Sequence, residues 1–440
     1  MMKKLSLSIV IVLFFLGCKS NSQPPSPTSI LISGVNIVDV DKGSILENQH
    51  VVIDSGRILS ITDQIVDPVS FGNSIDGSGK FLIPGLAEMH AHIPSPNTSR
   101  ERLEETLFLY LSNGITTIRG MLGHPMHLEL RQEVADGNVL GPRIFTSSPS
   151  LNGNSVPTAE EARSKVTDYA AAGYDFLKIH PGIKKDVFDT LVATANEKGI
   201  AFAGHVPVEV GIRHALNSEF ASIDHIDGYL EGLVPTDKGL DPNTNGFFGY
   251  NFTDETDPAL IEELVLLTKE KQVWIVPTQS LFERWFAPTT AEEMLSQPEM
   301  QYMPVSTLDQ WKSRKLQSTG DESGFDAAKW ERFIKIRRDL LKSLHDHGHG
   351  IILGSDAPQL FNVPGFSIHH EIEGMLRAGL SPLEILRTGT VNPAKYFGME
   401  LIFGQVKEGL EADLVLLDGN PLEDLNHLKT ISGVFVRGHW

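Results

Sequence analysis

Six side chains that can bind metal ions or transfer protons stand within or just after short apolar segments. They are His90, His92, Lys178, His205, His225 and Asp356. Taken singly, such residues have ordinary explanations: a histidine beside a strand is often a core residue, and an aspartate there often caps the next helix. All six at the same kind of position are harder to explain by packing. Imidazole and carboxylate groups bind divalent ions well, so the set favours a metal site.

Lys178 is the most informative of the six. It stands in the apolar run Phe176-Leu177-Lys178-Ile179, where an unpaired ammonium group would be buried at considerable cost. A desolvated, neutral amine can instead react with CO2 to form a carbamate. This anionic group offers two oxygen ligands and can bridge two metal ions. We therefore predict a carbamate on Lys178.

The spacing of the other five side chains suggests how they share two ions. His90 and His92 are two residues apart, so both can face the same side and hold one ion together with Asp356. His205 and His225 can hold the second ion. Two divalent ions lower the pKa of a bridging water from about 15.7 toward neutrality, and Asp356 can accept its proton. The predicted nucleophile is a metal-bridging hydroxide.

Four further residues are weaker candidates for the substrate site. Tyr229, one helical turn after His225, could donate a hydrogen bond to an oxyanion or a substrate carboxylate, or could simply line a wall. Arg119 could bind a substrate carboxylate through two parallel hydrogen bonds, or could be structural. His180 could touch the substrate or orient the carbamate, and His124 could reach the pocket from the second strand–helix loop.

The elements that must position these residues follow a regular alternation. From residue 85 onward, strand-like apolar segments alternate with helical patterns at intervals of roughly thirty residues. Eight strand segments are predicted, at residues 86–89, 116–119, 143–146, 174–179, 201–204, 222–224, 273–277 and 351–355. Helix starts at Thr158 and Ser381 have the pattern of capping boxes. The predicted fold is α/β, a (β/α)8 TIM barrel over residues 85–399, whose catalytic rim lies at the strand C-termini.

The two ends of the folded chain have a different pattern. Residues 30–84 and 400–440 are rich in short strand signals, including a hairpin turn at Asp54-Ser55-Gly56. We predict that they form one small β-sandwich domain built from both termini. Long irregular stretches at 229–258 and 279–327 interrupt the alternation and are expected to shape a pocket.

The first residues predict export from the cytoplasm. Lys3 and Lys4 precede an apolar run at 5–16 that ends in Gly17-Cys18. We predict a lipoprotein signal peptide at 1–17, lipid attachment at Cys18 and a disordered tether at 18–29. An ordinary signal peptide with an incidental cysteine is the alternative. The predicted location is the bacterial cell envelope, as a membrane-anchored lipoprotein facing the periplasm or the cell exterior.

Composition limits the classes of partner. The chain of 440 residues is 41% hydrophobic and carries a formal net charge of −19. It should therefore fold, and it should repel nucleic acid and anionic membranes. The single cysteine excludes an internal disulfide framework and a cysteine-rich metal site. We expect a small-molecule substrate and membrane contact only through the lipid anchor. A homo-oligomer is compatible with the sequence, which leaves the oligomeric state open.

Taken together, the motifs resemble the amidohydrolase superfamily of metal-dependent hydrolases. The resemblance is greatest to its imidazolonepropionase-like and Xaa-Pro dipeptidase group, which uses a carboxylated lysine. The matching residues are Phe81-Leu82-Ile83-Pro84-Gly85-Leu86, Met89-His90-Ala91-His92, Asn113-Gly114-Ile115-Thr116-Thr117-Ile118-Arg119, Lys178, His205, His225, Gly354-Ser355-Asp356, Asn392-Pro393-Ala394 and the segment 412–421.

The resemblance implies a (β/α)8 barrel flanked by a β-sandwich, usually a zinc pair, and hydrolysis of amide or ester bonds. Lys178 favours the binuclear, dipeptidase-like branch. The ligand types themselves do not choose among zinc, manganese, cobalt and iron. One departure is Gly120, because many relatives have an acidic residue after the arginine at this place. The contribution of the second strand to substrate binding therefore stays open.

The predicted function is that of a binuclear metal-dependent hydrolase. It would cleave the amide C–N bond of a small substrate, with a dipeptide or an N-acyl amino acid favoured. Two alternatives remain open. One is a lactone, ester or phosphotriester hydrolase that uses the same metal pair. The other is a non-catalytic metal-binding lipoprotein.

Overall fold

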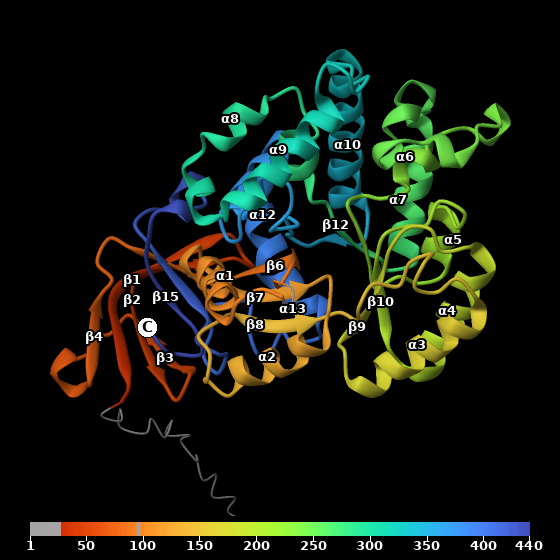
Figure 1. Cartoon of the computed structure of the whole chain (residues 1–440). Coiled ribbons are helices and arrows are strands. Elements are labelled where there is room, and N and C mark those ends of the chain that lie inside the picture. Colours follow the sequence, from red (N-terminus) through yellow and green to blue (C-terminus); the bar gives the residue numbers. More distant parts are fainter. Residues whose placement is uncertain (1–27, 95–96) are drawn as a thin grey trace, which may run out of the picture.

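A computed structural model describes residues 28–94 and 97–440 (Figure 1). The predicted signal peptide, Cys18 and the tether up to residue 27 lie outside these residues, so lipid attachment stays a prediction. None of the helices in the described ranges has the length and apolar character needed to cross a membrane.

Eight parallel strands form the centre of the fold, as predicted. They lie in two hydrogen-bonded arcs, one with the order β6-β7-β8 and the other with the order β13-β12-β11-β10-β9. Their bounds are β6 (Leu86–Ala91), β7 (Ile115–Gly120), β8 (Arg143–Thr146), β9 (Phe176–Ile179), β10 (Ala201–Gly204), β11 (Ser222–Asp224), β12 (Trp274–Val276) and β13 (Gly350–Ile351). The eighth strand is shorter than the predicted segment 351–355.

Backbone hydrogen bonds join the two arcs at both junctions. Met89 N donates to Leu353 O over 2.8 Å, just beyond β13, and Ser148 N donates to Phe176 O over 2.8 Å, between the end of β8 and β9. The strands therefore follow one another around a ring, which gives an α/β fold of TIM-barrel type. All eight strand C-termini point to the same end of this ring.

Amphipathic helices pack around the strands and bury one apolar face each. The helices that alternate with the strands are α1 (Arg100–Ser112), α2 (Pro125–Ala135), α3 (Ala159–Ala172), α4 (Lys185–Lys198), α5 (Ile212–Asn217), α7 (Ile261–Glu270), α10 (Ala327–His347), α11 (Ser367–Arg377), α12 (Pro382–Gly389) and α13 (Val391–Tyr396). Both predicted residues cap their helices, but the full capping box is confirmed only at Ser381. Thr158 Oγ1 accepts a hydrogen bond from Glu161 N, and Ser381 forms a complete capping box with Glu384.

The two chain ends meet in one seven-stranded sheet, in which red and dark blue strands lie side by side (Figure 1). Its order is β15-β14-β5-β1-β2-β3, with β4 paired to β1. The bounds are β1 (Ile30–Asp39), β2 (Ser44–Asp54), β3 (Arg57–Thr62), β4 (Asn73–Asp76), β5 (Phe81–Pro84), β14 (Leu414–Leu417) and β15 (Ile431–Phe435). The described strands therefore form a single connected sheet. The predicted β-sandwich would have two facing sheets, and the hydrogen bonding does not show such a division.

The two irregular stretches fold over one another beside the barrel. The first contains α6 (Tyr229–Gly232), η2 (Thr236–Lys238), η3 (Pro242–Thr244), η4 (Phe247–Glu255) and η5 (Pro258–Leu260). The second contains η6 (Leu281–Trp285), α8 (Ala291–Leu295), η7 (Pro298–Tyr302) and α9 (Val305–Thr319). Figure 1 shows α6, α8 and α10 along one side of the molecule. An aromatic cluster that includes Tyr250, Phe282 and Phe333 packs them together.

Candidate metal centre

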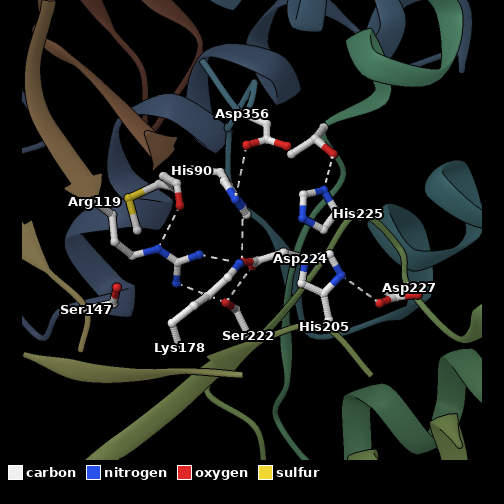
Figure 2. A network of polar contacts seen from close by, with 12 residues as sticks. His90, Arg119, Ser147, Lys178, His205, Ser222, Asp224, His225, Asp227 and Asp356 are labelled. Atoms are coloured by element: carbon white, nitrogen blue, oxygen red, sulfur yellow. Dashed lines mark hydrogen bonds and ion pairs between the residues drawn. The ribbon is translucent and has the colours of Figure 1, made fainter. Parts of the chain in front are cut away.

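The strand ends bring the four predicted histidines into one cluster, and Figure 2 shows three of them, His90, His205 and His225. His90 lies in β6 with His92 just after it, while His205 and His225 directly follow β10 and β11. The ring centroids of His90 and His92 are 5.4 Å apart, and those of His90 and His225 are 4.6 Å apart. His205 and His225 are also separated by 4.6 Å. Residues 135 positions apart in sequence, such as His90 and His225, thus become direct neighbours.

Asp356 faces this cluster from beyond β13. Its Oδ1 atom lies 2.6 Å from His92 Nε2 and 3.4 Å from His90 Nε2. Ligand atoms of His90, His225 and Asp356 all lie within 4.8 Å of one another, and all three residues are buried. Two imidazoles and a carboxylate at this spacing can hold one divalent ion.

Neighbouring side chains orient two of the imidazoles. His205 Nδ1 lies 3.0 Å from Asp227 Oδ2, and His225 Nδ1 lies 2.7 Å from Thr278 Oγ1. These bonds occupy the Nδ1 atoms and leave the two Nε2 atoms available for an ion, an arrangement typical of metal-binding histidines. The sequence analysis did not single out Asp227 or Thr278. Asp227 could have been found, because it is an acid only two residues after a predicted ligand.

Lys178 lies in β9 with its side chain fully buried. Among the described residues, its Nζ atom has no hydrogen-bond partner, and Asp224 Oδ2 lies 3.6 Å away. Burial lowers the pKa of the Lys178 amine, although the carboxylates of Asp224 and Asp356 act in the opposite direction. The amine thus lies beside the imidazoles with Asp224 as its ion-pair partner, and the carbamate on Lys178 stays a prediction.

Asp224 is an important residue that the sequence analysis missed. It is fully buried, and its Oδ2 atom lies 3.1 Å from His90 Nδ1, without the alignment of a hydrogen bond. Burial by itself would raise the pKa of this carboxyl, but the positive charges of Arg119 and Lys178 lower it overall. Asp224, like Lys178, is a charged residue in an apolar strand, so its cost of burial could have identified it from the sequence.

Arg119 does not face the substrate side. Its guanidinium is completely buried, and each of its nitrogens donates to protein atoms: Nε to Met89 O, Nη1 to Ser222 Oγ and Tyr396 Oη, and Nη2 to Asp224 Oδ1. These distances lie between 2.7 and 3.0 Å. Because these donors all bind protein atoms inside the barrel, the prediction that Arg119 binds a substrate carboxylate is wrong. The contacts fit the alternative, a structural role.

Tyr229 and His124 are also held by the protein. The Tyr229 hydroxyl lies 2.6 Å from Thr268 Oγ1 of α7 in the fully buried core. It therefore points into the packing of α6 on α7 rather than toward the histidines. His124 is the N-cap of α2, and its Nδ1 atom accepts a hydrogen bond from Met126 N over 3.2 Å. Neither residue joins the cluster.

His180 does join the cluster. Its ring stacks on that of His205, with centroids 5.1 Å apart and an interplanar angle of 27°. Its Nδ1 atom is buried and has no hydrogen-bond partner in the described part of the chain. Burial, aided by Lys178 and His205, lowers the pKa of this imidazole, so it is neutral at physiological pH. His180 is thus placed to contact a carbamate or a substrate.

Glu88 supports the centre from below and was not predicted. Its Oε1 atom accepts hydrogen bonds from His90 N (3.0 Å) and Ser355 N (2.8 Å), and its Oε2 atom accepts one from Ser355 Oγ (2.5 Å). Burial raises the pKa of this carboxyl to about 8. Because Ser355 precedes Asp356, these bonds fix the backbone positions of two predicted ligands relative to each other.

Gly204 is required by the packing around Lys178. It has a φ angle of +129°, and an added Cβ would lie 2.3 Å from Ile179 O and 3.1 Å from Lys178 Cδ. We expect Gly204→Ala to displace the lysine, lower the bound metal severalfold and destabilise the protein by about 1–3 kcal/mol. Metal analysis and thermal unfolding would measure both effects.

The control is Gly199→Ala at the end of α4. Its φ angle is also positive, at 66°, but an added Cβ would meet nothing within 4 Å. This variant should lose stability by about 1–2 kcal/mol from backbone strain alone and keep its metal. Unchanged metal content in Gly204→Ala would contradict the packing argument.

Comparison with known proteins agrees with this geometry. The family model described as Amidohydrolase family matches residues 81–440. Ochratoxinase from Aspergillus niger is 22% identical over 450 residues, which cover 87% of this chain and 80% of that protein.

Two solved structures share the fold. A putative prolidase from Bifidobacterium longum has a TM-score of 0.67 and 23% sequence identity, and 94% of each chain is covered. A Xaa-Pro dipeptidase with methionine bound in its active site has a TM-score of 0.67 and 18% identity, covering 94% of this chain and 99% of that one. Since the family model spans well over half of the chain and the cluster occupies the strand C-termini, the protein belongs to the amidohydrolase family.

Proposed function

We propose that this chain is a binuclear metal-dependent hydrolase that cleaves the amide C–N bond of a small substrate. A dipeptide or an N-acyl amino acid is the favoured substrate class. The observation that carries the proposal is Lys178, a fully buried amine that makes no hydrogen bond to any described residue and lies beside the clustered histidines and Asp356. A carbamate on this amine would supply the anionic bridge that a pair of cations needs.

We assign the ligands to two ions as the sequence suggests, although His90 and His225 also lie together, with ring centroids 4.6 Å apart, and share one candidate group with Asp356. His90, His92 and Asp356 would hold one ion, His205 and His225 the other, and the modified Lys178 would contact both. Zinc is the favoured metal. Two such ions, when bound, activate a water molecule and polarise the carbonyl group of the substrate.

The protein's own residues supply the proton transfers and the dry surroundings. Asp356 lies where it can take a proton from the attacking water and return it to the leaving nitrogen. His90, Lys178 and His225 are at most 2% exposed, so the floor of the site excludes solvent. Below them, the buried Asp224 carboxylate forms an ion pair with Arg119. The same carboxylate lies 3.1 Å from His90 Nδ1 and 3.6 Å from Lys178 Nζ.

The preference for an amide bond is supported by the relatives. Two structures that share this fold over nearly the whole chain are described as a putative prolidase and a Xaa-Pro dipeptidase. We also propose, from the sequence alone, that Cys18 carries a lipid that anchors the enzyme in the cell envelope.

Turnover by the metal-loaded protein tests the proposed reaction. The panel contains Xaa-Pro dipeptides, other dipeptides, N-acyl amino acids, lactones and a phosphotriester. We expect C–N hydrolysis of at least one amide, loss of this activity after chelation, and recovery when metal is added back. Turnover of lactones or esters alone would favour the first alternative, while firm metal binding without any turnover would favour a non-catalytic lipoprotein.

A further inference from the structure

Phe248 is the aromatic side chain that stands beside the proposed second metal position. Its ring centroid lies 5.8 Å from that of His205 and 5.4 Å from that of His225. On its other side it contacts Phe247 at 4.7 Å and Phe282 at 5.1 Å. The side chain is only half-buried. The ring therefore lies between the aromatic cluster and the two imidazoles, and part of it stays accessible.

The backbone at Phe248 is unusual. Its φ and ψ angles are 49° and 47°, which is the left-handed region that bulky residues rarely adopt. Gly246 and Gly249, on either side, also have positive φ angles, of 71° and 80°. A conformation of this kind persists only where the surrounding structure enforces it, and such residues concentrate at functional sites.

Contacts with α6 enforce this turn. Gly249 packs so closely on α6 that an added Cβ would lie 2.6 Å from Leu230 Cδ2 and 3.1 Å from Glu231 Oε2. Glu231 Oε1 also accepts a hydrogen bond from Asn245 Nδ2 over 2.6 Å. Because α6 begins four residues after His225, the turn and the metal-binding histidine are held by the same short element. These contacts hold the backbone that places the Phe248 ring beside the imidazoles of His205 and His225.

We propose that Phe248 is a specificity-determining residue that forms an apolar subsite for the acyl group of the substrate. This inference rests on the proposed function and deepens it by naming the substrate class: amides whose acyl part carries an aromatic or large apolar group. A ring that is held in place and remains partly accessible offers such a group a flat surface at little entropic cost.

The position of Asp356 indicates why the subsite takes the acyl side. Asp356 contacts His92 and His90 and delivers the proton to the leaving nitrogen, so the amine part must lie toward that side. Both Asp356 and Phe248 lie near His225, but Phe248 also contacts His205, which lies outside the group formed by Asp356, His90 and His225. The acyl part, on the other side of the scissile bond, is then directed toward the Phe248 ring.

Two pairs of substrates test this inference on the full-length, metal-loaded protein. Phenylacetyl-glycine against acetyl-glycine varies the acyl side, and acetyl-phenylalanine against acetyl-glycine varies the amine side. We expect the wild type to prefer phenylacetyl-glycine by about 10–100-fold in kcat/KM. Phe248→Ala should reduce that preference by about tenfold or more, Phe248→Leu should reduce it less, and the amine-side ratio should change by less than about twofold.

Calorimetric binding of the acyl products gives a readout other than turnover. Phenylacetate should bind Phe248→Ala about tenfold or more weakly than it binds the wild type, while the affinity for acetate and the metal content stay the same. Phe286→Ala is the matched control. The Phe286 ring belongs to the same aromatic cluster and contacts Phe247, Tyr250 and Phe325, so its loss should lower the thermal midpoint and leave the selectivity unchanged.

The outcomes separate this inference from the proposed reaction. If the wild type hydrolyses no amide, the proposed reaction fails, and the phenylacetate affinities alone decide the role of Phe248. An equal acyl-side preference and an equal phenylacetate affinity in the wild type and Phe248→Ala would overturn the subsite. A preference that appears only on the amine side would overturn it as well.

Discussion

Replacing Lys178 by alanine is expected to reduce the bound metal from two ions per chain to one or none and to abolish turnover. Loss of an outer partner of a metal ligand typically costs about 10–100-fold in affinity or activity. Loss of a bridging ligand should exceed this range. Metal analysis of the purified variant and kcat/KM on the best amide substrate would measure the two effects.

The same variant should fold normally. The Lys178 amine is buried and makes no hydrogen bond within the part of the chain that the structure describes, so its removal relieves a desolvated polar group while leaving a cavity beside β9. We therefore expect only a small change in the thermal midpoint of the metal-free protein. Lys185→Ala, which removes an exposed ion pair with Asp189, is the control and should keep both metals. A Lys178→Ala protein with two ions and full turnover would refute the carbamate.

A second large effect is expected for Asp356→Asn. The amide oxygen can still bind a metal ion, but the side chain can no longer accept and return a proton. General acid–base catalysis contributes about 10²–10⁴-fold, so kcat should fall by that factor with little change in KM. Steady-state kinetics at saturating metal would measure this loss.

Asp227→Asn separates proton transfer from metal binding. Asp227 only orients His205 through their 3.0 Å contact, so this variant should weaken metal binding, and excess metal should restore its turnover. Asp356→Asn should not recover in this way. Recovery of Asp356→Asn by excess metal would show that Asp356 acts as a ligand alone.

The barrel strands and the principal ligands could be predicted because both depend on local signals. Short apolar segments mark the strands, and the C-terminal ends of parallel strands share one rim, so residues at these ends must converge. The shared rim brings His90, His205, His225 and Asp356 together. Predicting this needs only the order of the elements and no knowledge of how side chains pair.

The partners of these ligands depend on long-range packing and could not be predicted in the same way. Thr278 orients His225 from 53 residues away, and Glu88 bonds to Ser355 across 267 residues. Arg119 shows the converse case. Its residue type suits a carboxylate ligand, but the protein supplies that carboxylate itself, from Asp224 at a separation of 105 residues.

The sheet of the chain ends shows a similar limit. Alternating apolar residues indicate a strand, but they do not indicate which strand lies beside it. Pairing of β5 with β1 on one edge and β14 on the other joins both ends in one connected sheet. The Phe248 turn also depends on its contacts with α6, which the sequence does not reveal. Gly246 and Gly249 beside it indicate only that left-handed backbone is tolerated there.

Anomalous diffraction from crystals of the metal-loaded wild type tests the central claim most directly. We predict two anomalous peaks about 4 Å apart between the two histidine pairs, with electron density for a carboxylate on Lys178 Nζ that reaches both. A single peak, with an unmodified Lys178 paired to Asp224, would contradict it.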